Sequence, residues 1–145
     1  MEIRRAGLDH VRQAAYLTVL LWPHNHLEEM EQEMEELLRS EENAVFLAWD
    51  SEKAVGFVHC SLRHDYVEGA SYSPTAYLEG IYVREDYRNH GIARQLLSAC
   101  ENWAKEMNCS QLASDCELSN SGSLVFHLKN GFTETNRIIC FLKDL

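Results

Sequence analysis

A short turn between an apolar segment and an amphipathic segment contains the residue types that bind phosphate. The turn reads R-N-H-G-I-A from Arg88 to Ala93, and Arg94 follows it. Glycine at a helix start lets the backbone approach an anion, and the first helical turn offers unpaired N–H groups at the positive end of the dipole. Arg88 and Arg94 can add charge-assisted contacts. The turn predicts a pyrophosphate site, although an ordinary packing glycine between a strand and a helix is the alternative.

Two carboxylates occupy matching places in two segments with strand character. Glu79 lies in the segment Y-L-E-G-I-Y-V, and Asp115 ends the segment L-A-S-D. Two carboxylates that face one cleft would bind a molecule with several ammonium groups. The alternative is that both are strand ends that face solvent.

Two aromatic residues stand at loop edges, where aromatic rings often form walls for sugar rings or cations. Trp22 precedes Pro23 at the end of an expected helix, and Tyr66 lies in a long loop that contains Gly69 and Pro74. Ordinary packing in the core or at its rim is the alternative for each. Both residues are therefore candidates for the wall of a binding site.

The hydrophobic pattern predicts the elements that must position these residues. Apolar runs rich in Val, Phe and Ala predict strands over 2–6, 43–50, 54–63, 77–83, 110–115 and 132–145. Helical spacing predicts helices over 8–22, 27–40, 91–107 and 119–131. Asp9 is the expected cap of the first helix, and Ser119 or Asn120 that of the last. The order β-α-α-β-β-β-α-β-α-β predicts one α/β domain, residues 1–145, around a mixed sheet.

Composition limits the classes of partner and site. The net charge of −10 disfavours nucleic acid and anionic membrane surfaces and suits a cationic ligand, although solubility alone also explains it. No apolar run approaches the ~20 residues that span a bilayer. The 5 cysteines show no C-x-x-C spacing and read as reduced thiols of a cytoplasmic protein. His24 and His26 have no neighbouring cysteine or third ligand, so we expect no metal site.

The turn and its surroundings resemble the GCN5-related N-acetyltransferase (GNAT) family. The family signature [QR]-x-x-G-x-[GA] matches the residues Arg88, Asn89, His90, Gly91, Ile92 and Ala93. A second family element, an asparagine that opens the next helix, matches Asn120, and that helix ends in N-G-F. The resemblance implies a mostly antiparallel mixed sheet that splays between its two central strands, with helices on both faces. It also implies acetyl-CoA as co-substrate.

The same resemblance implies how the co-substrate is bound. Ile81, Tyr82 and Val83 would offer backbone groups to the pantetheine arm. The turn from Arg88 to Arg94 would hold the pyrophosphate, and Asn120 would bond the arm further along.

Several other segments resemble one branch of the family, the aminoglycoside 6′-N-acetyltransferases. They are L-L-W-P at 20–23, L-R-H-D-Y-V-E-G at 62–69, S-P-T-A-Y-L-E-G-I-Y-V at 73–83, A-S-D at 113–115 and N-G-F-T-E-T at 130–135. The resemblance implies that the antibiotic site is lined by Trp22, Tyr66, Glu79, Asp115 and Asn136. Asn136 departs from the branch, whose members carry an acid there. An asparagine accepts a hydrogen bond from an ammonium group but adds no charge.

The expected reaction needs an unprotonated amine, because an ammonium group has no lone pair. Glu79 or Asp115, directly or through water, would orient the amine and accept its proton, with binding and orientation as the larger role. The N–H of Val83 would stabilise the oxyanion. His127 stands where many family members carry a tyrosine. It would either protonate the departing thiolate or pack beside the co-substrate.

The chain after N-G-F supplies about one strand, whereas the family closes its sheet with a hairpin. An unpaired edge invites a partner, so we expect a homodimer formed through the C-terminal strand.

Three activities remain open on the residues. They are acetylation of an aminoglycoside, acetylation of a polyamine, protein N-terminus or other small amine, and CoA binding without catalysis.

Overall fold

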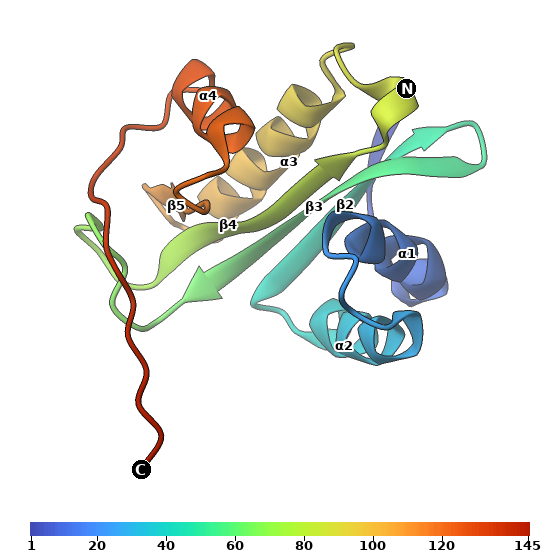
Figure 1. Ribbon diagram of the computed structural model, residues 1–145. Helices are drawn as coiled ribbons and strands as arrows, with labels where there is room; N and C mark the ends of the chain where they lie inside the picture. The colour runs from blue at the N-terminus through green and yellow to red at the C-terminus, as the bar shows by residue number, and fades with distance from the viewer.

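Five strands form one sheet with helices on both of its faces (Figure 1). The computed structural model describes all residues, 1–145. Its elements are β1 Glu2–Arg5, a 3₁₀ turn Leu8–His10, α1 Val11–Leu21, α2 Leu27–Arg39, β2 Asn43–Asp50, β3 Lys53–Arg63, β4 Thr75–Val83, a 3₁₀ turn Glu85–Tyr87, α3 Ile92–Glu106, β5 Leu112–Ser114 and α4 Ser121–Lys129. The strands lie in sequence order, and only β4 and β5 are parallel. This confirms the predicted α/β class with its mostly antiparallel mixed sheet.

The alternating side chains of the strands build two apolar layers, one on each face of the sheet. Val58 and Cys60 of β3 pack with Leu96 and Trp103 of α3 on one face. Phe57 packs on the other face with buried residues of α1 and α2. The period of two along β3 thus separates the α3 layer from the layer of α1 and α2.

The pairing of β4 changes at Glu79. His59 pairs with Gly80, but Cys60 pairs with Leu78, so Glu79 is an extra residue in β4 that has no partner in β3. Such a bulge bends its strand and turns a side chain toward a new direction. On its other side β4 pairs with β5 only from Ala76 to Leu78, and the rest of β4 has no partner there. The sheet therefore opens between β4 and β5, the two strands of the expected splay, with β5 at the edge of the sheet.

Two expectations about the ends of elements are wrong. Asp9 does not cap α1, because it lies in the 3₁₀ turn before that helix, and the N-cap residue is His10. The segment 132–145 is not a strand, and beyond the half-buried Phe132 its large apolar side chains are exposed, Phe141 by 90% and Leu142 by 95%. The edge strand β5 that precedes this segment has only three residues, so it offers few backbone groups to pair with a further strand.

Candidate active site

The turn between β4 and α3 presents a row of backbone N–H groups. Gly91 is the N-cap residue of α3 with φ of 78°, and Asn89 is also left-handed, with φ of 65°. The N–H groups from Asn89 to Arg94 donate to no backbone carbonyl, and the first bond of the helix runs from the Gln95 N–H to the Gly91 oxygen at 3.1 Å. Free amides at the positive end of a helix suit an anion, so the turn has the geometry expected of a pyrophosphate site.

Glycine is needed at residue 91 for the conformation of the backbone. A Cβ there would meet no protein atom within 4 Å, so packing does not exclude a side chain. The positive φ does, because it is strained for most L-residues. The same missing Cβ leaves the amides open to a ligand.

The side chains of the turn have separate tasks. Arg88 donates from Nε to the Val83 oxygen at 2.9 Å, and its guanidinium lies 5.4 Å from the centre of the Tyr82 ring. Arg88 therefore ties the turn to the end of β4. Ile92 is buried in the α3 layer, so only its backbone can face a ligand. His90 and Arg94 are exposed, and Ala93 is half-buried.

At two of the three expected residues, Ile81 and Val83, the backbone N–H and C=O groups of β4 face the side of the strand that has no partner. The Arg84 N–H donates to the Val55 oxygen, and the register continues with Gly56 opposite Val83 and Val58 opposite Ile81. Because bonded and non-bonded pairs alternate in an antiparallel ladder, the N–H and C=O groups of Ile81 and Val83 point away from β3. They point to the side where β4 has no partner. Tyr82, by contrast, directs its backbone groups to β3.

Glu79 and Asp115 lie where the sheet splays. Leu78 and Ser114 form the last pair between β4 and β5, and the two carboxylates are the next residues of their strands. The predicted matching places are therefore found in the structure. The two side chains are connected through Arg63 and Tyr77, which sequence reasoning had not assigned to the site.

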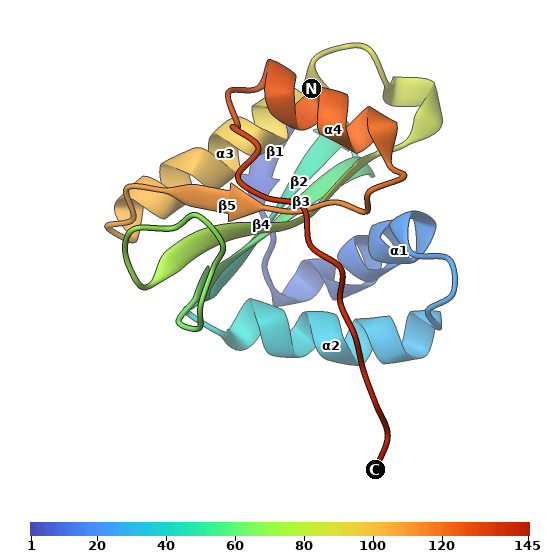
Figure 2. The ribbon, with the colours of Figure 1, turned by 60° about the vertical axis from the view of Figure 1, so that its left-hand side comes forward.

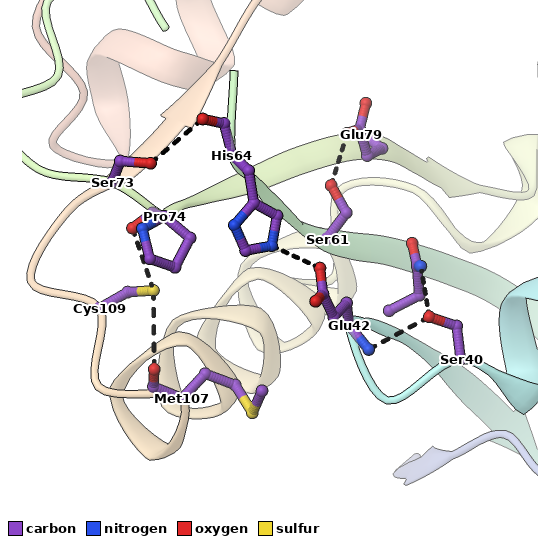
Figure 3. Close-up of polar contacts among 10 residues, drawn as sticks. Ser40, Glu42, Ser61, His64, Ser73, Pro74, Glu79, Met107 and Cys109 are labelled. Atoms are coloured by element: carbon purple, nitrogen blue, oxygen red, sulfur yellow. Dashed lines mark hydrogen bonds and ion pairs between the residues drawn. The ribbon is translucent and has the colours of Figure 1, made fainter. Parts of the chain in front are cut away.

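Arg63 and Ser61, both on β3, hold Glu79. Arg63 donates from Nη2 at 2.6 Å and from Nε at 2.9 Å, and the Ser61 hydroxyl donates at 2.6 Å; Figure 3 shows the contact between Ser61 and Glu79. Burial alone favours the neutral carboxyl group, but these hydrogen bonds prevail and hold the pKa of Glu79 below its ordinary value. Glu79 is thus ionised and paired with a cation.

Tyr77 connects Arg63 to Asp115. The Arg63 guanidinium lies 3.5 Å from the centre of the Tyr77 ring, and the Tyr77 hydroxyl donates to Asp115 Oδ2. Burial and this hydrogen bond raise the pKa of Tyr77 well above its ordinary value. Asp115 therefore has a neutral donor, whereas Glu79 has a cationic one.

Trp22 closes the other side of Glu79. A Cβ on Gly80, the residue after Glu79, would lie 2.6 Å from Cη2 of Trp22. The indole therefore packs against the β4 backbone at Gly80, which has no side chain. Its ring centre lies 6.4 Å from that of Phe57 in an edge-to-face arrangement. The structure thus packs Trp22 against the backbone of the residue next to Glu79, and Trp22 stays a candidate wall of the site.

Tyr66 and Asn136, which are 70 residues apart by number, share one partner. The Tyr66 hydroxyl donates to Glu68 Oε2 at 2.6 Å, and Asn136 Nδ2 donates to Glu68 Oε1 at 2.8 Å. These hydrogen bonds lower the pKa of Glu68. The tyrosine ring is 84% exposed, so it does not pack in the core. Sequence reasoning missed Glu68, although it lies inside the L-R-H-D-Y-V-E-G segment.

Comparisons with known proteins agree with this geometry. Residues 11–132 match the acetyltransferase (GNAT) family. The chain belongs to this family. It is 43% identical over 130 residues to an aminoglycoside N(6′)-acetyltransferase type 1 of Acinetobacter genomosp. 13, covering 89% of this chain and 88% of that one.

Solved structures of aminoglycoside acetyltransferases have the same fold as this GNAT chain. The enzyme AAC(6′)-Iy in complex with CoA superposes with a TM-score of 0.95 at 35% identity, over 99% of this chain and 95% of the other. The same enzyme with the bisubstrate analogue CoA-S-monomethyl-acetylneamine gives a TM-score of 0.94 at 35% identity, over 99% and 98%. As a GNAT enzyme, this chain is an acetyltransferase that uses acetyl-CoA.

His127 bridges two elements of the GNAT fold. Its Nδ1 lies 2.6 Å from the Ser123 oxygen, and its Nε2 lies 2.7 Å from the hydroxyl oxygen of Ser114. Because a carbonyl oxygen can only accept, Nδ1 donates to the Ser123 oxygen. It connects α4 to the last residue of β5, directly before Asp115. Both ring nitrogens are occupied within the protein.

Asn120 is the N-cap residue of α4, and its Oδ1 accepts a hydrogen bond from the Ser123 N–H at 3.1 Å. This confirms one of the two expected caps and leaves Nδ2 available for another acceptor.

No three His, Cys, Asp or Glu side chains of the GNAT chain converge in a metal-binding arrangement. None of its helices has the length and apolar content needed to cross a bilayer.

Proposed function

We infer that this chain transfers the acetyl group of acetyl-CoA to the 6′-amino group of aminoglycosides and so confers resistance to these antibiotics. The observation that carries the inference is the placement of Glu79 and Asp115 at the splay of β4 and β5. This acidic pair lies beside the gap that receives the co-substrate. Relatives with up to 43% identity are named aminoglycoside N(6′)-acetyltransferases, and the match includes the loops that carry Trp22 and Tyr66.

Acetyl-CoA supplies the activated acyl group, and the chain binds it chiefly through its backbone. The amides from Asn89 to Arg94 hold the pyrophosphate, with Arg94 adding charge at the exposed rim. The backbone groups of Ile81 and Val83 face the pantetheine arm along the open edge of β4. Asn120 Nδ2 donates to the arm further along. The N–H of Val83 stabilises the negative charge that develops on the thioester oxygen.

The acidic residues bind and orient the amine. An aminoglycoside carries several ammonium groups, and carboxylates that stay ionised attract them. Glu79 has a lowered pKa and is therefore a weak base, so its role is to fix the 6′-amine in the line of attack. Asp115, which has no cationic partner, accepts the proton of the amine directly or through water.

His127 has two candidate roles, and its contacts favour one of them. A proton donor to the departing thiolate needs a ring nitrogen that faces the co-substrate. Both nitrogens instead contact Ser123 and Ser114. We propose that His127 is a positioning residue, which holds β5 and thereby Asp115 against α4.

We propose that the enzyme is a homodimer formed through its C-terminal segment and that it acts in the cytoplasm. The exposed side chains Ile138, Ile139, Phe141 and Leu142 form an apolar run at the end of the chain. Such a run suits pairing with the sheet of a second copy, where its side chains leave water. All 5 cysteines are free, which agrees with a reducing compartment.

Mass spectrometry tests the proposed function directly. The purified protein is incubated with acetyl-CoA and kanamycin or tobramycin, and fragmentation locates the added acetyl group. The expected product has one acetyl group on the 6′ nitrogen. Spermidine and a peptide with a free N-terminus serve as competing substrates. Faster thiol release with either of these would overturn the assignment. If none of the amines causes thiol release although CoA binds, the protein would be a CoA-binding module.

A further inference from the structure

Glu68 carries a negative charge that no cation of the protein neutralises. Its two carboxylate oxygens accept hydrogen bonds from the neutral donors Tyr66 and Asn136. Glu79, by comparison, is bound by the guanidinium of Arg63. An ionised carboxylate with only neutral donors keeps its attraction for a cation from solution.

The structure holds Glu68 and Asn136 next to each other by packing as well as by their hydrogen bond. A Cβ on Gly69 would lie 2.6 Å from Cγ2 of Thr135, so the two chain segments touch at the neighbouring residues. Gly69 has φ of 80°, which a glycine adopts freely. The pairing of Glu68 with Asn136 is therefore fixed by the contact between the backbone of residue 69 and Thr135.

The loop that carries Glu68 is anchored at several points along its length. His64 lies 2.6 Å from Glu42 of the segment before β2, and the Ser73 hydroxyl donates to the His64 oxygen at 3.2 Å (Figure 3). Val67, next to Glu68, is buried. The Ser71 N–H donates to Gln111 Oε1 at 2.8 Å. Glu68 is thus presented from an ordered surface.

Each of the two segments that form this surface follows an element with a residue linked to one of the site carboxylates. The loop starts directly after Arg63, which binds Glu79. The other segment follows α4, whose His127 contacts Ser114 beside Asp115. Figures 1 and 2 show the chain leaving α4 and running beside the loop between β3 and β4. Tyr66, Glu68 and Asn136 therefore form one wall where these two segments meet.

We propose that Glu68 is a substrate-binding residue of this enzyme, whose carboxylate binds an ammonium group of the aminoglycoside other than the 6′-amine. The inference rests on the proposed function. The 6′-amine must reach the splay at Glu79 and Asp115, so an ammonium on another part of the antibiotic meets the wall. Asn136 adds no charge of its own, and the carboxylate of the wall lies one hydrogen bond away on Glu68.

Steady-state kinetics of Glu68→Gln tests the proposal, with Glu52→Gln as the matched control. Glu52 is exposed in the turn between β2 and β3, at the opposite end of β3 from the loop, so its removal changes the net charge equally. We expect the KM for the antibiotic to rise about fivefold in Glu68→Gln and to stay unchanged in Glu52→Gln. The kcat and the KM for acetyl-CoA should stay within about twofold in both.

The double variant Glu68→Gln/Asn136→Asp separates charge from local structure, because it exchanges the amide and the carboxylate across the same hydrogen bond. We expect the KM for the antibiotic to return to within about twofold of the wild-type value. No recovery would assign the loss to a disturbed loop and overturn the proposal. Equal KM values in Glu68→Gln and Glu52→Gln would also overturn it. If the wild-type enzyme still acetylates the antibiotic in that case, the proposed function stands. A wild type that acetylates no aminoglycoside would instead remove the proposed function and this inference with it.

Discussion

Arg63 binds both carboxylate oxygens of Glu79, with Nη2 2.6 Å from Oε1 and Nε 2.9 Å from Oε2. A bidentate pair fixes the direction of the carboxylate and offsets its charge. The acidic pair of the site is therefore unequal: Glu79 is ionised and held by Arg63, which offsets its charge, whereas Asp115 accepts only from the Tyr77 hydroxyl. This inequality supports the proposed roles, orientation for Glu79 and proton acceptance for Asp115.

The pair between Arg63 and Glu79 should make stability depend on pH at the acid side. The folded-state pKa of Glu79 is lowered, so its contribution is present above the ordinary value of 4.5 and is lost as the pH falls through the lowered value. We expect Arg63→Met to reduce the free energy of unfolding by about 1 kcal/mol at pH 7. The difference from wild type should shrink below pH 4.5, as urea denaturation at several pH values will measure.

An exposed pair provides the control for that experiment. Arg39 and Glu35 lie 3.1 Å apart on the surface of α2. Arg39→Met should change the free energy of unfolding by less than about 0.5 kcal/mol at any pH. A difference for Arg63→Met that is the same at pH 7 and pH 4 would show that Glu79 is not the partner that matters.

Gly91 should be required for co-substrate binding rather than for folding. We expect Gly91→Ala to fold with a loss of about 1–2 kcal/mol, because alanine is strained at a φ of 78°. Gly91→Asn should lose less, since asparagine tolerates this conformation. Both variants should weaken CoA binding at least about tenfold in titration calorimetry, because any Cβ obstructs the amides. Wild-type affinity in the asparagine variant would place the pyrophosphate elsewhere.

The contact between Trp22 and Gly80 should appear as coupling in a double-mutant cycle. Gly80→Ala places a Cβ 2.6 Å from the indole and should cost about 1–3 kcal/mol while raising the KM for the antibiotic. In a Trp22→Ala background the same change should cost little, because the obstructing ring is gone. Thermal denaturation and steady-state kinetics of the four proteins measure both effects. Additive losses would mean that the indole does not lie on Gly80.

His127 should affect stability more than chemistry. His127→Ala removes two hydrogen-bond contacts, one to the Ser123 oxygen and one to the Ser114 hydroxyl, so we expect a loss of about 1–3 kcal/mol in unfolding free energy. Turnover at saturating substrates should remain within about threefold at a temperature where the variant is folded. A fall of about a hundredfold, with loss of the basic limb of the pH profile, would instead support an acid role.

The C-terminal segment should determine the oligomeric state. We expect the wild type to be a dimer in light scattering at micromolar concentration, because the apolar side chains at its end need a partner. The double variant Ile139→Asp/Phe141→Asp places two charges in the exposed run and should give folded monomers. A monomeric wild type would contradict the proposed dimer.

The sequence by itself determined the order and type of nearly all elements and the position of the turn that is the candidate phosphate site. These features depend on local signals: the period of two in β3, the helical period of α3, and a glycine that only a left-handed turn requires. It also identified Glu79 and Asp115 through their matching places in two strand segments. The strand predicted over residues 132–145 is not formed, because strand-like composition does not provide a neighbouring strand to pair with.

Only the tertiary structure decided the partners of the site residues. The bulge at Glu79, the guanidinium of Arg63 on Tyr77, and the carboxylate of Glu68 between Tyr66 and Asn136 all join residues that lie apart in the chain. No spacing rule predicts such contacts, because they depend on which strands pair and where a loop is anchored. The charge that each carboxylate offers to a substrate depends on those partners. That charge is therefore set by the tertiary structure and cannot be read from the order of residues.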